Sequence, residues 1–481
     1  MNDYINERKI VRFFLPVVFP EGIAPGDGSI NNMNVIALDG QNRHVLRGTA
    51  LAGVLRKEFA DNENLERDDD AVNLFFGEKA DTDINRECSK VITYNTFLKM
   101  GESREEIRMH NSVDRHNGAV RDKSLFSLAA LPAGTEAEIR LDLNIPPGTL
   151  SEEDVQKFIK NITVIFSNGL YMGGNKSRGI GFTELKTEKA GYTVYNLSEE
   201  NGLKKFLSDD YLLRIGEESL QPEVKLSAEI PERLYSSKIS VEFTIPRGQD
   251  VLIGDSVNID FQLQAQKTIK TDGETYWRLP GASFKGIFRS WFNRLVALDG
   301  EYVADSAFEY AESGPFKSDD IAWCRPENES EREQWKKHPD EIPCPVSRLF
   351  GSLYSSSRIF FRDVLIKQSD VTEDIRKHVA LSAISGGAVE GSLFDNNVLQ
   401  GIPGKSFTLT VLIDSPDEKD MDLLKKTLKA IDSGILRIGS SKSAGRLAVK
   451  KVTVEGDFSD KFKNEEWLGE NPYKHFFSGG N

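Results

Sequence analysis

The sequence predicts an α+β chain built from two tandem domains of the ferredoxin-like, or RRM-like, kind. The first observation is a repeated motif: residues 279–286 (LPGASFKG) match residues 46–53 (LRGTALAG) at an offset of 233 residues. The second is that the hydrophobic pattern around each copy gives the same order of strand, helix, strands, helix and strand. This order is typical of the split β-α-β fold, whose sheets commonly carry single-stranded RNA.

The first domain is expected over residues 1–187. Apolar and alternating runs predict strands over 9–19, 35–38, 91–97, 124–130 and 137–143. The motif at 46–53 leads into a first helix. Ser151, followed by three acidic residues, predicts the start of a second helix that runs to about Asn168 and ends in Gly169. Pro16 is expected at the edge or the end of the first strand, because proline cannot donate to a ladder.

The second domain is expected over residues 238–455, with its first strand at 239–245. An insertion over about residues 298–345 follows its first helix. Residues 188–237 show little pattern and are interpreted as a linker, and residues 456–481 as a C-terminal tail.

Four more blocks repeat in the same order. They pair 75–77 with 349–351, 117–120 with 386–389, 125–126 with 393–394, and 176–179 with 442–445. Because several matched blocks in one order are hard to obtain by chance, the chain is interpreted as a duplicated domain.

Bulk properties narrow the class of function. The formal net charge of −14 argues against non-specific binding of nucleic acid by the whole surface, but a local basic groove is compatible with it. No apolar run is long enough to span a bilayer and the N-terminus lacks a signal pattern, so a cytoplasmic protein with no membrane partner is expected. The three cysteines do not form a disulfide framework.

The helix after the second motif carries residue types that bind phosphate. Ser283 is expected to cap this helix, and Lys285 and Arg289 lie four residues apart on one face. Free amides at a helix N-terminus and two cations suit a phosphate. Thr49 and Arg56 are the candidates at the start of the first-copy helix and on its face. The alternative is an ordinary solvated helix face.

Each copy also ends in a glycine-rich loop. The candidate RNA-binding residues are Gly174, Lys176, Ser177 and Arg178 in the first loop and Gly439, Lys442 and Arg446 in or beside the second. Cations on a flexible backbone suit phosphate contacts. The loops lack the Gly-Lys-Ser/Thr order of a nucleotide-binding P-loop, and the alternative is an ordinary turn.

These motifs together resemble the RAMP superfamily, and more narrowly the backbone subunits of type III CRISPR–Cas effector complexes. The resemblance covers roughly residues 8–187 and 238–455, and the tandem arrangement is similar to the double backbone proteins of the III-D subgroup. It implies two RRM-like cores with β-hairpin thumbs that bind a CRISPR guide RNA among other effector subunits. It also implies that the thumbs kink the duplex between the guide and a target RNA.

The resemblance further implies metal-dependent cleavage of single-stranded target RNA by an aspartate that follows the first strand. Asp260 is the expected residue in the second copy, where it would hold Mg²⁺, and Asp255 is the fallback. Asn32 stands at the corresponding place in the first copy, with Asp27 as the nearby substitute. Both copies are thus expected to bind guide RNA and the second to cut. If Asp260 only forms an Asx-turn, the chain is instead a non-catalytic scaffold.

His110, Arg115 and His116 lie in the expected first thumb. They are interpreted as polar hairpin residues that contact RNA. Two histidines near a cation would also serve as an acid–base pair in a metal-independent endoribonuclease that processes guide RNA, which is the third alternative.

Cys324, His338 and Cys344 in the second-copy insertion are candidate ligands for Zn²⁺. Relatives place a Cys-Pro-x-Cys pair before the Leu-Phe-Gly block, whereas the chain has Ser347 at the second position. Since one thiolate is missing and three ligands make a poor structural zinc site, free buried thiols are the favoured interpretation.

Overall fold

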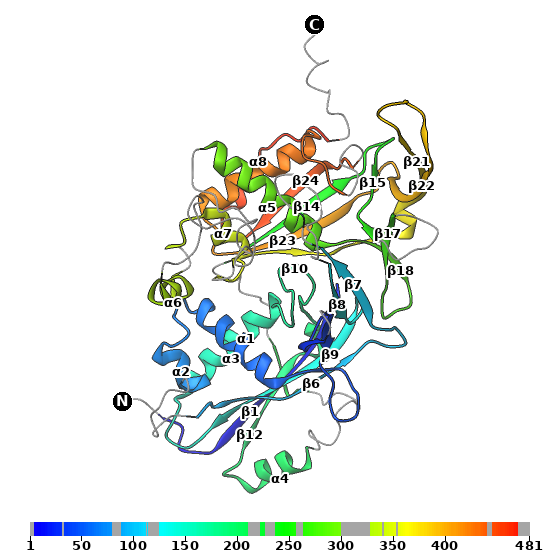
Figure 1. Cartoon of the computed structure of the whole chain (residues 1–481). Coiled ribbons are helices and arrows are strands. Elements are labelled where there is room, and N and C mark those ends of the chain that lie inside the picture. Colours follow the sequence, from blue (N-terminus) through cyan, green and yellow to red (C-terminus); the bar gives the residue numbers. More distant parts are fainter. Residues whose placement is uncertain are drawn as a thin grey trace.

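The computed structural model of the chain is an α+β structure, as predicted, in which two halves lie against each other (Figure 1). It describes residues 4–30, 33–78, 88–111, 113, 125–209, 222–226, 236–255, 263–299, 328–338, 341–352, 355–439 and 445–469. Within these ranges, no helix has both the length and the apolar character needed to cross a membrane. Five predicted site residues lie outside the described residues: Arg115, His116, Asp260, Cys324 and Lys442.

The first half is built on a sheet around β1 (Lys9–Phe19), the strand predicted over 9–19. The other strands are β4 (Val45–Leu46), β5 (Val91–Thr93), β6 (Thr96–Lys99), β9 (Thr135–Ile145), β11 (Glu184–Leu185), β12 (Gly191–Asn196) and β13 (Val224–Lys225). β1 pairs antiparallel with β9 along its whole length. On its other side it pairs first with β12 and then with β11.

Pro16 lies inside β1, so the prediction that it marks the edge or the end of the strand is wrong. β12 pairs with β1 only as far as Phe14, and β11 begins opposite Val17. Pro16 therefore falls between two neighbouring strands, where its missing N–H removes no ladder bond. Its carbonyl accepts a hydrogen bond from the amide of Lys186 at 2.9 Å.

Three helices pack on one face of this sheet: α1 (Gly48–Asn62), α2 (Asp70–Phe76) and α3 (Glu152–Ser167). Phe158 of α3 meets Phe13 of β1 at 6.0 Å and Phe75 of α2 at 5.1 Å between ring centroids. Burying each such ring contributes about 2–3 kcal/mol. Ser151 caps α3 in a capping box with Asp154, as the sequence predicts.

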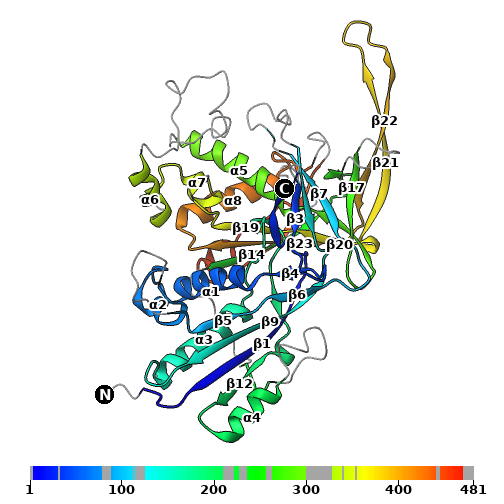
Figure 2. The ribbon, with the colours of Figure 1, turned by 60° about the horizontal axis from the view of Figure 1, so that its bottom comes forward.

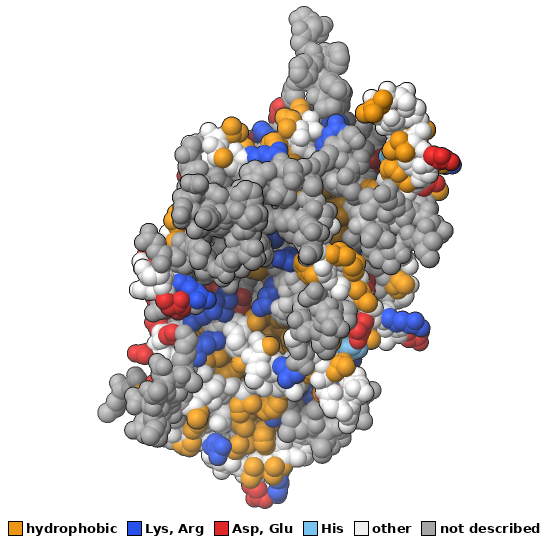
Figure 3. Space-filling model, in the orientation of Figure 1, with side chains coloured by type: hydrophobic (Ala, Val, Ile, Leu, Met, Phe, Trp, Pro, Cys, Tyr) orange, Lys and Arg blue, Asp and Glu red, His pale blue; other side chains and the backbone are white. Residues whose placement is uncertain are grey.

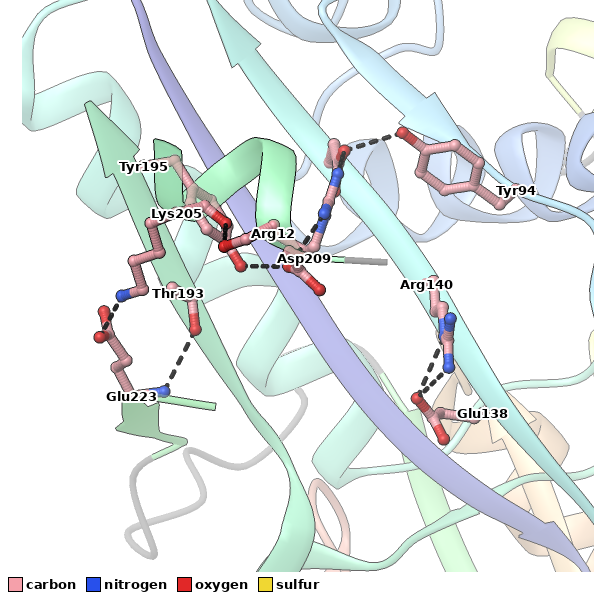
Figure 4. Close-up of polar contacts among 11 residues, drawn as sticks. Arg12, Tyr94, Glu138, Arg140, Thr193, Tyr195, Lys205, Asp209 and Glu223 are labelled. Atoms are coloured by element: carbon pink, nitrogen blue, oxygen red, sulfur yellow. Dashed lines mark hydrogen bonds and ion pairs between the residues drawn. The ribbon is translucent and has the colours of Figure 1, made fainter. Parts of the chain in front are cut away.

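The segment expected to be a linker instead completes this sheet. Its β12 adds to the edge of β1, and its α4 (Glu200–Ser208) covers the face opposite α1 and α3. Arg12 on that face donates to both carboxylate oxygens of Asp142 at 2.9 Å and to Asp209 at 3.1 Å (Figure 4). Its guanidinium lies 4.9 Å from the ring centre of Phe206 in α4. α4 thus closes the sheet face on which RRM-like folds commonly hold RNA.

The second half contains a sheet in the order β10-β19-β23-β14-β24. These strands are β10 (Arg178–Gly179), β14 (Ser236–Thr244), β19 (Ile359–Arg362), β23 (Phe407–Asp414) and β24 (Ala448–Glu455). The main core of this half includes residues of α5 (Gly281–Leu298), α7 (Pro345–Phe350) and α8 (Glu418–Asp432), and α6 (Glu329–Lys337) lies in the insertion. A further sheet contains β15 (Asp250–Val251), β16 (Gly254–Asp255), β17 (Leu263–Ile269), β18 (Thr275–Leu279), β20 (Val364–Lys367), β21 (Val371–Leu381) and β22 (Ala388–Gly401).

Both halves repeat one arrangement. The first strand (β1 or β14) lies between a third strand (β9 or β23) and a fourth strand (β11 or β24), and a second strand (β5 or β19) lies beyond the third. α1 and α5 follow the first strands, and α3 and α8 precede the fourth. Residues 91–97 match 359–365 at an offset of 268, so Asn95 corresponds to Asp363.

Each half also carries a β-hairpin. In the first hairpin, β7 (Glu106–His110) pairs with β8 (Phe126–Ala130), which joins a small sheet with β2 (Gly26–Ile30) and β3 (Met33–Ile36). In the second hairpin, β21 pairs with β22 and projects from the body (Figure 2). His110 stacks on Phe126 at 5.2 Å, and His378 stacks on Phe394 at 5.1 Å. The hairpins therefore correspond at the same offset of 268.

Candidate nucleic-acid interface

The glycine-rich loop of the first half becomes part of the second half. Its strand β10 pairs in parallel with β19, with Arg178 opposite Phe361 and Gly179 opposite Arg362. The amide of Asp363 donates to the carbonyl of Gly179 at 3.0 Å. Gly179 has a φ of +112°, and a Cβ there would lie 1.7 Å from Oδ1 of Asp363. Only glycine fits this crossing, so the loop sequence serves the junction between the halves.

Asp363 also fixes the start of α5. Its Oδ1 accepts a hydrogen bond from the amide of Gly281 at 2.8 Å, and Asn95 does the same for Gly48 in α1 at 2.9 Å. Pro280 is the N-cap, and the amide of Ser283 donates back to the carbonyl of Pro280, so the predicted cap by Ser283 is wrong. The amides of Gly281 and Ser283 already donate to groups inside the protein. A phosphate bound at the start of α5 would therefore be held by side chains.

A buried ion network holds the seam between the halves. Arg108 of the first hairpin donates to Asp363 at 2.6 Å and to the backbone carbonyl of Glu21 at 2.9 Å. Glu106 accepts from Arg278 of β18 at 2.6 Å and lies 3.3 Å from Arg108. Sequence reasoning missed these residues. The correspondence between Asn95 and Asp363 could be found from the sequence repeat. Nothing in the sequence indicates that the first hairpin contacts the second half.

Lys285 lies beside this network, on the first turns of α5. Its ammonium donates to the hydroxyl of Ser177 at 2.7 Å and to that of Ser357 at 3.0 Å. Burial, and then the positive charges of Arg289 and Arg178, lower the pKa of Lys285 to about 7. The two hydroxyls that hold Lys285 are neutral. An anion that binds beside this lysine would therefore raise the fraction of it that is protonated.

A second group of cations surrounds Lys176 of the glycine-rich loop. Burial lowers the pKa of Lys176, and the positive charges of Lys57 on α1 and of Arg67 lower it further. Figure 3 shows Lys and Arg side chains gathered where α1, α6 and β10 approach one another. We call Lys57, Arg67, Lys176, Arg178, Lys285 and Arg289 the seam cluster.

The electrostatics of the seam cluster favour a polyanion. Burial is the main cause of the lowered pKa of both Lys285 and Lys176. The charges of neighbouring cations lower these pKa values further, which means that the cations also repel one another in the protein alone. Phosphates placed between them would relieve that repulsion and release counterions. The arrangement therefore suits a phosphodiester backbone and carries no base-specific contacts of its own.

Comparison with known protein families agrees with the interpretation of the seam cluster as a nucleic-acid site. Residues 23–184 and 263–446, well over half of the sequence, match the RAMP superfamily. The chain belongs to the RAMP superfamily. This membership implies a CRISPR-associated, RNA-binding subunit, and the two matches agree with the tandem repeat of RAMP domains. No curated protein matches the chain.

Several residues predicted to bind RNA meet in this RAMP protein. Lys176, Ser177, Arg178, Lys285 and Arg289 come together at the seam, although the first three are over a hundred residues from the last two. Ser283 is half-buried in the first turn of α5, and Thr49 is exposed in the first turn of α1.

Other predicted residues have structural partners. Arg56 donates to the backbone carbonyls of Arg67 and Gly77 at 2.9 and 2.8 Å, which ties α1 to α2. Arg446 donates to the carbonyls of Asp432 and Gly469, both at 3.2 Å. The amide of Gly174 donates to Ala24, and Gly439 packs against the carbonyl of Leu252. RNA contacts by these residues stay predictions.

The fallback catalytic residues occupy corresponding strands of this RAMP protein. Asp27 lies in β2 and Asp255 in β16, each on a short strand after the first strand of its half. Asp260 lies outside the described residues, so its side chain has no described surroundings against which to test Mg²⁺.

The zinc prediction gains no ligand cluster from the structure. Among the described residues, no group of three or more His, Cys, Asp or Glu side chains could hold a metal. Cys344 is buried, and its Sγ accepts from the amide of Ser347 at 3.4 Å as the N-cap of α7. His338 is exposed at the end of α6. Cys344 is therefore a buried thiol outside any disulfide, and Zn²⁺ at Cys324, His338 and Cys344 stays a prediction.

His110 is placed within the seam. Burial, helped by the charges of Arg178 and Arg108, lowers the pKa of His110 to about 4. At neutral pH this ring is uncharged and a weak base. That argues against His110 as half of an acid–base pair for metal-independent cleavage.

Proposed function

We propose that the chain is a tandem backbone subunit of a type III, III-D-like CRISPR ribonucleoprotein. It binds guide RNA along the seam cluster, and its second half cuts complementary single-stranded target RNA at Asp260. The two repeated cores would act as ferredoxin-like platforms and the two hairpins as thumbs. The observation that carries the proposal is Lys285, a half-buried cation at a seam between RAMP halves that is held by hydroxyls and repelled by other cations.

Guide binding by the seam cluster depends on phosphates and not on sequence. Lys285, Arg178 and Lys176 belong to opposite sides of the junction between the halves, so a strand that follows the junction contacts both halves. Because each phosphate contact on a single strand contributes roughly −0.7 to the slope of log affinity against log salt, binding should weaken steeply as salt rises.

Cleavage is proposed for the second half alone. Mg²⁺ held by Asp260 would neutralise charge that develops on the target phosphate. The protein would contribute position: a kinked target strand places a 2′-hydroxyl in line with its own phosphorus. Asn32 in the first half lacks the carboxylate for the same task.

Guide binding is tested on the full chain purified with its nucleic acid. Sequencing of the bound small RNA should recover CRISPR repeat-derived fragments. Arg178→Ala with Lys285→Ala should lower the affinity for such RNA by about tenfold or more, since each removes a phosphate contact. The control is Lys204→Ala, whose exposed side chain pairs with Glu200 on α4 far from the seam. A chain that binds no RNA, or a double variant with the affinity of the Lys204→Ala control, would contradict the proposal.

Cleavage is tested in the assembled complex. Asp260→Ala should abolish one product of target cleavage while guide binding persists, and EDTA should abolish the same product in the unmodified complex. Asp255→Ala and Asp27→Ala are the matched comparisons. If Asp260→Ala yields the same products at the same rates, Asp260 is not catalytic. If no variant of this chain changes any product, the chain is a binding scaffold.

A further inference from the structure

The side-chain nitrogen of Lys285 is held by hydroxyls and not by carboxylates. It lies 2.7 Å from the hydroxyl of Ser177 and 3.0 Å from that of Ser357. The charged groups that act on it, Arg289 on α5 and Arg178 on β10, are both cations. Among the described residues, no carboxylate pairs with Lys285. These surroundings favour the neutral amine over the ammonium ion.

The two hydroxyls also leave this amine ready to react. A neutral amine has two N–H donors and one lone pair, and two hydroxyl acceptors use both donors. Ser357 donates its own proton to the carbonyl of Ile359 at 2.8 Å, so its lone pairs are available to accept from Lys285. The lone pair of the amine then stays free for attack on an electrophile.

The fraction of Lys285 that is neutral is large at physiological pH. Burial and the two arginines lower its pKa to about 7. At pH 7 about half of this side chain is then neutral, against roughly one part in 2,500 for a lysine with the ordinary pKa. A weaker base is also a weaker nucleophile, so the gain in reactivity is smaller than the ratio of these fractions.

The arginines beside the amine favour an anionic reagent. Arg178 is exposed and follows Ser177 in the glycine-rich loop, and Arg289 lies one helical turn from Lys285. Guanidinium groups bind phosphate through charge-assisted hydrogen bonds. A small molecule with a phosphate next to a carbonyl carbon would therefore bind with its phosphate on the arginine side and its carbonyl near the amine.

We infer that Lys285 is an acylation site whose reagent is an acyl phosphate. The lone pair of the amine attacks the carbonyl carbon and forms an amide bond. The bond between that carbon and the phosphate oxygen breaks, and the released phosphate takes one proton from the nitrogen. The products are an acylated lysine and inorganic phosphate. Because an amide carries no charge, acylation should also weaken guide binding, a consequence that rests on the proposed function.

The test uses the nuclease-treated full chain incubated with acetyl phosphate. Peptide mass spectrometry at pH 7 should find Lys285 acetylated about tenfold or more faster than Lys204, an exposed lysine paired with Glu200 on α4. Because the bound phosphate favours the ammonium form, the rate at Lys285 should level off above pH 7, by about pH 8.5. The rate at Lys204 should keep rising toward about pH 10.

Two comparisons separate the phosphate site from the reactivity of the amine. Inorganic phosphate should slow acetylation of Lys285 by acetyl phosphate more than its acetylation by a neutral reagent, N-acetoxysuccinimide. Arg178→Gln, which changes an exposed side chain, should likewise slow the reaction with acetyl phosphate more than the reaction with the neutral reagent. Equal effects on the two reagents would contradict the choice of an acyl phosphate.

Three further results would overturn the inference. One is a Lys285 that is acetylated no faster than Lys204 at pH 7. A second is a rate at Lys285 that rises with pH in parallel with the rate at Lys204. A third is faster acetylation of Lys176, the other lysine of the seam cluster with a lowered pKa, which would place the nucleophile elsewhere. Repeat-derived RNA should protect Lys285; acetylation as expected without such protection would contradict the proposed path of the guide and leave the acylation site in place.

Discussion

Nη1 of Arg108 lies 2.6 Å from Oδ2 of Asp363, although the two residues are 255 positions apart and belong to different halves. Both side chains are buried, at 7% and 1% exposure. The other carboxylate oxygen of Asp363 accepts from Gly281 at the start of α5, and its amide donates to Gly179 of β10. One residue thus joins the first hairpin, the glycine-rich loop and the helix that carries Lys285.

Removal of Arg108 should destabilise the junction strongly. Arg108→Met leaves the buried carboxylate of Asp363 without its counter-charge, and breaking a buried pair from one side costs about 3–5 kcal/mol. Urea unfolding should report that loss in the free energy of unfolding. Lys204→Met on the surface of α4 is the control, with an expected change within about 0.5 kcal/mol. Equal unfolding curves for the two variants would show that the ion pair does not hold the halves together.

Gly179→Ala should separate β10 from β19. The backbone at +112° disfavours an L side chain, and the added Cβ would meet Asp363. The conformational cost alone is about 1–2 kcal/mol. Gly174→Ala is the matched control in the same loop, because its φ is not positive and its nearest atom, the carbonyl oxygen of Ala24, would lie at 3.5 Å. Hydrogen exchange at the amide of Asp363 should quicken in the first variant and stay slow in the second.

Asp209 should control how firmly α4 covers the sheet. No residue of α4 is buried, so the helix depends on contacts such as those of Asp209 with Arg12 and with the hydroxyl of Tyr195. Asp209→Asn weakens both, and α4 should become cleavable by a protease under native conditions. Glu223→Gln, which removes an exposed ion pair with Lys205, is the control. An α4 equally protected in both variants would mean that other packing retains it.

Local patterns in the sequence specify much of this fold. The alternating run at 137–143, the capping set at Ser151 and the paired glycine motifs at 48 and 281 each correspond to elements that form in the structure. These features depend on nearest neighbours along the chain, so periodicity and cap chemistry suffice to find them.

The contacts between the two halves could not be predicted from such local patterns. Gly179 looks like part of a phosphate loop, but its neighbour Asp363 comes from the other half. The apolar and polar residues of segment 191–196 form too weak a pattern to predict a strand. The segment becomes a strand because it pairs with β1. Pairings across hundreds of residues leave no local signature, which is why the seam cluster was found only in part.

Lys285 should make the affinity for RNA fall, and the free energy of unfolding rise, as pH increases. Its pKa is lowered to about 7 in the folded protein, while an unfolded chain keeps a value near 10.4. Above pH 7 the free site loses charge, so a bound phosphate must draw a proton back and the affinity for RNA should fall as pH rises from 6 to 8. In the RNA-free protein the unfolded state binds more protons over about pH 7–10. The free energy of unfolding should therefore rise over that range.

Two substitutions test whether Lys285 causes the pH dependence of RNA affinity and that of the free energy of unfolding. Lys285→Met removes the titrating group, so both slopes should be smaller than in the wild type. Lys285→Arg keeps a charge that does not titrate below pH 12, so its RNA affinity should vary less between pH 6 and 8 while remaining sensitive to salt. The measurements are fluorescence anisotropy with a repeat-derived RNA and urea unfolding, each over the pH series. A wild type whose RNA affinity follows the Lys285→Arg curve at every pH would show that Lys285 does not titrate between pH 6 and 8, which would contradict the prediction.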